Sequence, residues 1–237
     1  MNIVSLVPSV TETLLAWGVE PVAVTRFCEH PELPVVGGTK NPDVAAIVKL
    51  APDLVVMNEE ENRREDADAL KRDGLAVHVV RVRAVDDVPA ALDGLADAVG
   101  VDVPGVRLPG DRRPPAVRAF VPIWRRPWMT LNGDTYGSSL LRTLGVENVF
   151  ASAADRYPET TLDEAAALVP DVVLAPSEPY PFGARHVAEL EQVASVELVD
   201  GKDLFWWGVR TAGARERLAQ RLAIGSSRRW GAPEESA

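Results

Sequence analysis

Leu50-Ala51-Pro52-Asp53-Leu54-Val55-Val56 is the stretch that decides the fold, because the second half of the chain repeats it as Leu168-Val169-Pro170-Asp171-Val172-Val173-Leu174. An earlier stretch, 14–22, is repeated in the same way by 140–149, and the two pairs occur in the same order. This repeat predicts two similar α/β lobes of about 100 residues each, a size that supports an independent core. Two lobes make a cleft, and clefts are where small ligands usually bind.

Strands and helices are predicted to alternate in both halves. Apolar runs of strand length lie between segments with helical spacing, which is the pattern of a parallel sheet covered on both faces. The sequence therefore predicts an α/β fold with two Rossmann-like lobes. The predicted strands are 3–7, 22–25, 54–57, 77–82, 119–123, 148–151, 172–175 and 196–199, and the helices are 9–17, 42–51, 62–72, 86–99, 135–144, 161–169, 183–193 and 211–224.

Capping residues mark several helix starts. Ser9-x-x-Glu12 and Thr161-x-x-Glu164 have the spacing of capping boxes. Asn41 before Pro42 predicts an N-cap followed by a proline in the first turn. Asp134 fits the same N-cap role before 135–144.

Composition excludes several classes of protein. The net charge of −10 argues against nucleic-acid binding, which needs a basic face. The longest apolar runs are strand-sized, so no membrane span is predicted. The first residues lack the basic region of a signal peptide, and the single cysteine fits a reducing compartment, so we expect a cytoplasmic protein.

A segment rich in proline and glycine separates the two halves. Residues 100–118 contain four prolines, and no continuous helix passes through that spacing. The predicted organisation is an N-terminal lobe over 1–99, this linker, a C-terminal lobe over 119–224 and a disordered tail over 225–237.

Ligands of parallel α/β sheets sit at the carboxyl ends of the strands, so the loops there hold the candidate site residues. Pro8 ends the first strand, and Phe27, Cys28 and His30 follow the second. Cys28 and His30 are candidate metal ligands or ligand-lining residues. The alternative is that Cys28 is a small buried hydrophobe, since metal sites usually need three or four ligands.

Two further loops carry polar and aromatic candidates. Asn58 and Glu59 follow the strand 54–57, where the alternative is a solvated acidic helix start. Trp124, Arg126 and Trp128 follow the first strand of the second half. Tryptophan faces bind flat rings and arginine pairs with carboxylates or phosphates, whereas the alternative is that these residues pack a hinge.

The remaining candidates are mostly aromatic. They are Asp134 and Tyr136 after the tryptophan loop, Tyr180 and Phe182 after the strand 172–175, and Trp206 and Trp207 after the last strand. So many aromatic residues outside helices and strands indicate a pocket, and core packing is the alternative for some of them. The other two histidines are not candidates, because His78 is predicted inside a strand and His186 on a helix surface.

The motifs together resemble a known family. Residues 3–12 (Ile3-Val4-Ser5-Leu6-Val7-Pro8-Ser9-x-Thr11-Glu12), the stretch 50–55 and the stretch 144–150 are similar to the cobalamin- and siderophore-binding proteins of metal-chelate importers, the helical-backbone metal receptors. The resemblance implies the class III periplasmic-binding-protein architecture, with a corrinoid or another metal chelate as the ligand. Phe27-Cys28-x-His30-Pro31 and Val121-Pro122-Ile123-Trp124-Arg125 are similar to a signal-less, cytoplasmic branch.

The chain departs from that family in two ways. The long helix that joins the lobes of its members falls on the prolines of 100–118, so we expect a shortened or broken element. An ungapped match over 62–70 puts Arg64, with Glu65 adjacent, where importer-linked members carry an acidic docking residue. This difference argues against docking to an importer.

The sequence favours a cytoplasmic small-molecule-binding protein, a monomer or a homodimer, with the ligand in the interlobe cleft. Trp124 and Trp128 would stack on the ligand, and Arg126 would pair with an anionic group. One alternative is an enzyme on the same scaffold that uses Cys28, His30 and Glu59. Another is a regulatory module that binds a partner protein.

Overall fold

The computed structural model describes residues 1–103, 108 and 113–222. The chain forms two compact units. Unit 1 comprises Met1–Val82, Asp86–Leu108 and Trp207–Arg210, and unit 2 comprises Arg83–Val85, Pro109–Trp206 and Thr211–Ala237. Two short segments, 83–85 and 207–210, belong to a different unit from the residues on either side of them, and the predicted organisation does not include them.

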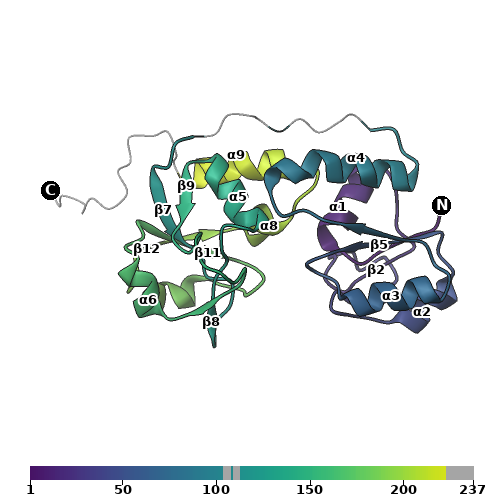
Figure 1. Cartoon of the computed structure of the whole chain (residues 1–237), viewed down its shortest axis with the longest axis horizontal. Helices are drawn as coiled ribbons and strands as arrows, with labels where there is room; N and C mark the ends of the chain where they lie inside the picture. Colours follow the sequence, from purple (N-terminus) through teal and green to yellow (C-terminus); the bar gives the residue numbers. More distant parts are fainter. Residues whose placement is uncertain (104–107, 109–112, 223–237) are drawn as a thin grey trace. The chain divides into compact units, whose positions relative to one another are not determined.

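Unit 1 is built on a four-stranded parallel sheet with helices on both faces. Figure 1 shows α2 and α3 on one face of this sheet and α1 and α4 on the other. Its elements are β1 (Ile3–Ser5), α1 (Pro8–Ala16), β2 (Ala23–Val24), β3 (Gly37–Gly38), β4 (Asn41–Pro42), α2 (Val44–Leu50), β5 (Leu54–Asn58), α3 (Arg64–Arg72), β6 (Val77–Val80) and α4 (Val88–Val99). A 3₁₀-helix over Val85–Asp87 leads into α4.

The core of unit 1 follows from the alternation of side chains along its strands. Val55 and Met57 pack with Ile47 of α2 and Leu70 of α3. Successive side chains of a strand point to opposite faces, so Val56 of β5, which is also fully buried, faces the other layer of helices. A strand buried on both faces needs the unbroken apolar run that the sequence shows here.

Unit 2 repeats the same plan. Figure 1 places α5 and α9 on one face of its sheet and α6 on the other. Its elements are β7 (Val117–Phe120), β8 (Trp128–Met129), α5 (Tyr136–Thr143), β9 (Val146–Asn148), β10 (Glu159–Thr160), α6 (Leu162–Ala167), β11 (Val172–Pro176), a 3₁₀-helix (Ala184–His186), α7 (Val187–Leu190), β12 (Ser195–Val199), α8 (Gly201–Phe205) and α9 (Thr211–Arg221).

The two sheets have the same strand order. Unit 1 has the order β2-β1-β5-β6, and unit 2 has β9-β7-β11-β12 when it is followed from the corresponding edge. Every neighbouring pair in both sheets is parallel. The prediction of an α/β fold with two parallel-sheet lobes is therefore confirmed.

The repeat extends to individual hydrogen bonds. The Asn2 N–H donates to Asp53 Oδ2 at 2.6 Å, and the Arg118 N–H donates to Asp171 Oδ2 at 2.7 Å. In return the Asp53 N–H donates to the Asn2 carbonyl, and the Asp171 N–H donates to the Arg118 carbonyl, both at 2.8 Å. Each aspartate of the repeated Pro-Asp motif thus ties the beginning of one central strand to the strand beside it.

The residue before each Pro-Asp motif has a left-handed backbone. Ala51 has φ 45° and Val169 has φ 51°. A side chain strains this conformation, and a β-branched one strains it most. Both units keep the conformation because the chain must leave a helix there and turn directly into a strand.

Two predicted helix starts are wrong. Pro8 occupies the first turn of α1 and Val7 is the N-cap, so Ser9 lies too far along for a capping box and makes no capping bond. Asn41 and Pro42 form β4 rather than a helix start. The N-cap of α2 is Asp43, whose carboxylate accepts from the Ala46 N–H.

The N-terminal capping residues predicted for α5 and α6 are wrong in the first helix and confirmed in the second. The capping box of Thr161 and Glu164 at α6 is confirmed, with both of its hydrogen bonds present. Asp134 is not the N-cap of α5, because Thr135 takes that position and accepts from the Ser138 N–H.

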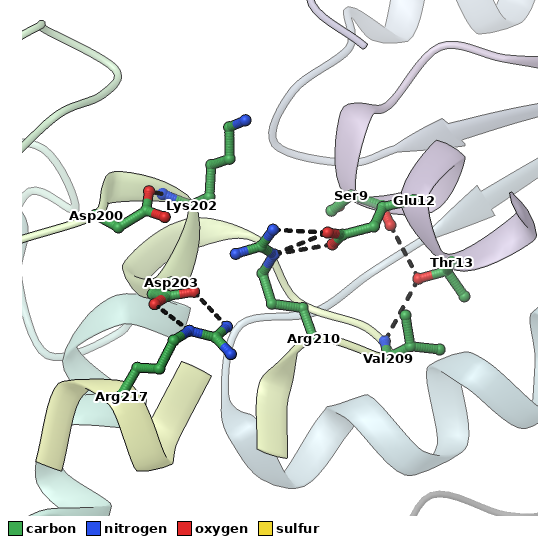
Figure 2. Close-up of polar contacts among 9 residues, drawn as sticks. All are labelled: Ser9, Glu12, Thr13, Asp200, Lys202, Asp203, Val209, Arg210 and Arg217. Atoms are coloured by element: carbon green, nitrogen blue, oxygen red, sulfur yellow. Dashed lines mark hydrogen bonds and ion pairs between the residues drawn. The ribbon is translucent and has the colours of Figure 1, made fainter. Parts of the chain in front are cut away.

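Glu12, which takes no part in a capping box, forms an ion pair with Arg210. Arg210 Nη2 lies 2.7 Å from Glu12 Oε1, and Arg210 Nε lies 2.9 Å from Glu12 Oε2. The Val209 N–H also donates to Thr13 Oγ1 at 3.5 Å, and Figure 2 shows both contacts on α1. These two contacts hold the segment Trp207–Arg210 against α1 within unit 1.

The helix before the linker ends where the sequence predicts. Gly100 has a left-handed backbone and caps α4. None of the described residues between 100 and 116 lies in a helix. Residues 104–107, 109–112 and the predicted tail lie outside the described residues, so the broken connecting element and the disordered tail stay predictions. No helix within the described ranges has both the length and the apolar character to cross a membrane.

Replacing Val169 by glycine should stabilise the protein. The left-handed backbone costs a non-glycine residue about 1–2 kcal/mol, and the greater freedom of glycine in the unfolded chain offsets about 0.5–1 kcal/mol of the relief. We expect V169G to raise the free energy of unfolding in urea by about 0.5–1 kcal/mol. The matched change in unit 1, A51G, should act in the same direction. A lower unfolding midpoint for V169G would contradict this account.

The Glu12–Arg210 pair should show measurable coupling. Its side chains are 30% and 18% exposed, so solvent screens it less than an exposed pair. A double-mutant cycle with E12A, R210A and the double variant should give about 1–2 kcal/mol of coupling in urea unfolding. The pair Arg64–Asp68, 3.8 Å apart with side chains 91% and 57% exposed, is the control and should couple by less than about 0.5 kcal/mol. Equal coupling in the two cycles would refute the anchoring role.

Candidate functional site

Five rings of unit 2 form what we term the aromatic cluster: Trp124, Trp128, Tyr180, Phe182 and His186. Trp128 stacks on Phe182, with centroids 5.9 Å apart and planes inclined by 5°. Tyr180 meets Trp124 edge-on at 5.6 Å and lies 4.7 Å from Phe182. Contacts of this kind stabilise aromatic pairs beyond the area that they bury.

The sheet brings these rings together. β7 and β11 are parallel neighbours, so the loops that follow them leave from the same edge. The loop after β7 carries Trp124, and the loop after β11 carries Tyr180 and Phe182. Trp128 lies on β8, which pairs with β10. The aromatic residues that the sequence selects from two distant stretches are therefore in contact.

The exposure of the rings in the aromatic cluster increases from the core of unit 2 to its surface. Phe182 is buried in the core of unit 2, and the partly buried Trp128 and Tyr180 pack against that core. Trp124 is 44% exposed. The alternative that these residues have a packing role therefore applies to the inner rings, whereas Trp124 offers aromatic surface to solvent.

Arg125, rather than Arg126, is the arginine built into the aromatic cluster. Its guanidinium lies 2.9 Å from a carboxylate oxygen of Glu189 and 5.9 Å from the centre of the Trp128 ring. The hydrogen bond with Glu189 raises the pKa of Arg125. Arg126 has a left-handed backbone and an exposed side chain, and no ion pair joins it to another described residue. The sequence favours Arg126, because the contact that distinguishes Arg125 comes from a distant helix.

His186 joins the aromatic cluster, although the sequence predicts a position on a helix surface. Its side chain is 3% exposed and meets Tyr180 and Phe182 edge-on, with centroids 5.5 and 5.4 Å away. The prediction is wrong because 183–193 is not one helix. A 3₁₀ turn over Ala184–His186 leads into the four-residue α7, and the histidine at the end of the turn is buried.

In unit 1, Asn58 organises the loop after β5. It is 2% exposed, and its side-chain oxygen accepts from the N–H groups of Glu60 and Glu61. Asn62 supports the same loop, since its amide donates to the carbonyls of Leu6 and Thr39. These bonds give Asn58 a structural role beside its predicted ligand-binding role.

Glu59 is the more accessible of the two predicted residues in that loop. Its side chain is 43% exposed, and one carboxylate oxygen lies 3.0 Å from Arg81 Nε. Glu59 lies before the helix rather than in its first turn, since α3 begins only at Arg64.

Cys28 and His30 have different partners. Cys28 is 2% exposed, packs with Val24 and Leu33, and lies 3.3 Å from the hydroxyls of Thr11 and Thr25. His30 Nδ1 lies 2.9 Å from a carboxylate oxygen of Glu32. The described residues contain no group of three or more side chains placed to hold a metal ion. The metal-ligand prediction for Cys28 and His30 gains no support from this geometry.

Three other predicted residues lie apart from the aromatic cluster. Pro8 is buried in the first turn of α1. Phe27 is 50% exposed, with the guanidinium of Arg26 5.2 Å from the centre of its ring. Tyr136 is buried, and its hydroxyl lies 3.0 Å from Thr211 Oγ1.

The last three predicted residues make contacts of their own. Asp134 pairs with Arg83 and Arg156. Trp206 belongs to unit 2, and Lys202 Nζ lies 5.0 Å from the centre of its ring. Trp207 is buried and belongs to unit 1.

A cavity of about 170 Å³ lies elsewhere in unit 2. Ser138, Arg142, Glu147 and Asn148 are among the residues that line it, beside the edge strand β9. None of the predicted ligand-binding residues belongs to its lining. The aromatic cluster is the better candidate site, because it combines exposed aromatic surface with neighbouring arginines.

Comparison with solved structures decides the fold family. The periplasmic vitamin B12 binding protein BtuF of Vibrio cholerae matches with a TM-score of 0.75 at 19% identity, over 96% of this chain and 98% of that one. A periplasmic haem-binding protein from Pseudomonas aeruginosa matches with a TM-score of 0.76 at 19% identity, over 96% of this chain and 94% of that one. This chain has the class III periplasmic-binding-protein fold.

Sequence comparisons agree with that fold. The family model described as Periplasmic binding protein matches residues 3–102. The vitamin B12-binding protein of Vibrio parahaemolyticus is 24% identical over 203 residues, which cover 78% of this chain and 71% of the relative. That of Yersinia pestis is 26% identical over 191 residues, which cover 73% and 68%. The family resemblance is therefore supported at the level of periplasmic binding proteins.

Burial makes a specific prediction for Cys28. A thiol that is 2% exposed reacts only when the structure opens locally. We expect a disulfide reagent such as DTNB to modify Cys28 at least about 100-fold more slowly in the folded protein than in urea. The control is the double variant C28S/V79C, because Val79 is 43% exposed and a thiol there should react rapidly. Rapid modification of Cys28 in the folded protein would count against its burial and in favour of a nucleophilic role.

Proposed function

We propose that this chain is a substrate-binding protein for a metal chelate of the cobalamin or haem type, and that the aromatic cluster of unit 2 contacts the ligand. Relatives with this fold are described as vitamin B12-binding and haem-binding proteins. The observation that carries the proposal is the graded arrangement of the aromatic cluster, in which buried Phe182 and half-buried Trp128 support exposed Trp124 through Tyr180.

The chemistry of the aromatic cluster suits such a ligand. Corrin and porphyrin rings are broad and largely apolar on their faces, and their rims carry amide, phosphate or carboxylate groups. A tryptophan ring binds the apolar part. Arg126 is exposed close to Trp124 in the sequence, and a guanidinium pairs with carboxylate or phosphate. Glu189 already engages Arg125, so Arg126 is the better group for an anionic rim.

An enzymatic role gains no comparable support. Cys28 is buried, His30 contacts Glu32, and Glu59 contacts Arg81. The first two follow β2 and the third follows β5. Among the described contacts, none joins two of these groups into an acid–base or nucleophile–base pair.

The cellular compartment in which the protein acts stays a prediction. Solved relatives are described as periplasmic, so the expected cytoplasmic branch gains no support from the comparisons. Arg64 is 91% exposed on α3, with Glu65 and Asp66 in the same first turn. This helix start therefore carries acidic groups of its own beside Arg64, and the sequence argument against importer docking stays a prediction.

Ligand titration tests the proposal. We expect the purified protein to bind cyanocobalamin or haemin, seen as heat in calorimetry and as a change in the visible absorption of the chelate. W124A should weaken binding by about 5- to 30-fold, because truncation of a ring that stacks on a ligand costs about 1–2 kcal/mol. R126A should weaken binding by a smaller factor through the loss of an exposed charge pair.

The matched control is W17A, which removes a tryptophan at the end of α1 in unit 1. This variant should bind as the unaltered protein does, because Trp17 lies outside the predicted site. Absence of heat and of spectral change with both chelates would overturn the proposed ligand class. Unchanged affinity in W124A would show instead that the aromatic cluster is not the contact surface.

A further inference from the structure

His186 packs against two rings that support the rest of the aromatic cluster. It meets Tyr180 and Phe182 edge-on at 5.5 and 5.4 Å, with planes inclined by 66° and 77°. Its side chain is 3% exposed although it carries two polar nitrogens. A change in the charge of this ring therefore acts directly on the packing of its neighbours.

The hydrogen bonds of His186 favour a neutral ring. The Gly183 N–H donates to Nδ1 at 3.1 Å, so that nitrogen carries no proton. A neutral ring then has its proton on Nε2, which lies 3.5 Å from the Tyr180 hydroxyl. Arg185 Nε donates toward Nε2 at 3.3 Å, a bond that needs the other neutral tautomer, so a neutral ring accepts from one of the two donors and a charged ring from neither. Of these three partners, only the tyrosine oxygen is able to accept a hydrogen bond from the ring.

Protonation of His186 would place like charges and hydrogen-bond donors against one another. Protonation adds a proton at Nδ1, the nitrogen that the neutral ring uses to accept from the Gly183 N–H, and it places a positive charge beside the Arg185 guanidinium. Burial lowers the pKa of His186, and the positive charges of Arg185 and Arg125 lower it further. Glu189 acts in the opposite direction, but its carboxylate already pairs with Arg125 at 2.9 Å.

We propose that His186 is a positioning residue that holds Tyr180 and Phe182 in place only while its ring is neutral, so that mild acid loosens the aromatic cluster and weakens ligand binding. The link to ligand binding rests on the proposed function. The loosening of the aromatic cluster does not, and it is tested without any ligand.

The direction of the pH dependence follows from the lowered pKa. In the unfolded chain a histidine takes up its proton near pH 6.5. The folded protein resists that proton, so the stabilising effect is complete above pH 6.5 and is lost as the pH falls from there through the folded pKa. A single proton limits the fall in affinity to about tenfold per pH unit.

The first experiment uses the ligand-free protein. NMR would follow the ring of His186 and the indole N–H groups of Trp124 and Trp128 from pH 8 down through the midpoint of the His186 titration, with signals assigned by substitution. We expect the indole signals to move with the same midpoint as His186, and to stay still in H186N. The asparagine oxygen takes about the place of Nδ1, so this variant keeps an acceptor for the Gly183 N–H without a titrating group.

The matched control is H78N. His78 lies on β6 of unit 1, and burial also lowers its pKa, so it titrates below the ordinary range of histidine outside the aromatic cluster. H78N should leave the movement of both indole signals unchanged. Indole signals that stay still while His186 titrates, or that move equally in H186N, would overturn the positioning role.

The second experiment measures cyanocobalamin affinity by calorimetry at pH 7.5 and at one pH unit below the midpoint that NMR gives for His186. We expect the unaltered protein and H78N to bind several-fold more weakly at the lower pH, within the limit of about tenfold per pH unit, and H186N to bind equally at both. Equal affinity of the unaltered protein at both values would overturn the link to binding. Absence of binding at either pH would remove cobalamin from the proposed function, and the NMR titration would then decide the role of His186 alone.

Discussion

The pairing of β5 with β1 in unit 1, and of β11 with β7 in unit 2, is the constraint on which the rest of the structure depends. β5 and β11 are buried along their whole length, so their backbone groups must find partners in the sheet. Asp53 and Asp171 tie the beginnings of the paired strands together and so fix their register. A fixed register brings the carboxyl ends to one edge, and the loops there are free to carry ligand-binding side chains.

The parts of this arrangement that local chemistry controls are predictable from the sequence. The Pro-Asp motif ends a helix and begins a buried strand in each unit, and both instances behave alike down to the left-handed residue before the proline. Thr161 and Glu164 form their capping box because both partners lie within one helical turn. Where the deciding contact is close in sequence, the pattern of residues is sufficient.

The errors arise where the deciding contact is distant. Ser9 and Glu12 have the spacing of a capping box, but Pro8 sets the helix start and Glu12 pairs with Arg210 from the far end of the chain. The partner that distinguishes Arg125 from its neighbour lies 64 residues away. The sequence predicts a helix surface for His186 because nothing local reveals that Tyr180 and Phe182 pack against its ring. Tertiary structure decides each of these cases, and local patterns in a single sequence do not reveal it.

The aromatic cluster is both part of the core and the candidate ligand surface, and this double role separates its members. Phe182 is buried and shares the core of unit 2 with Phe120 and Leu190, so its truncation would damage the fold before it revealed anything about a ligand. Trp124 makes only an edge contact with Tyr180 among the aromatic pairs of the described residues, and nearly half of it is exposed. Its loss would change the surface more than the core. The same gradient gives the proposed role of His186 its physical basis. A charge on this ring would disturb Tyr180 and Phe182, and Tyr180 is the ring that contacts the exposed Trp124.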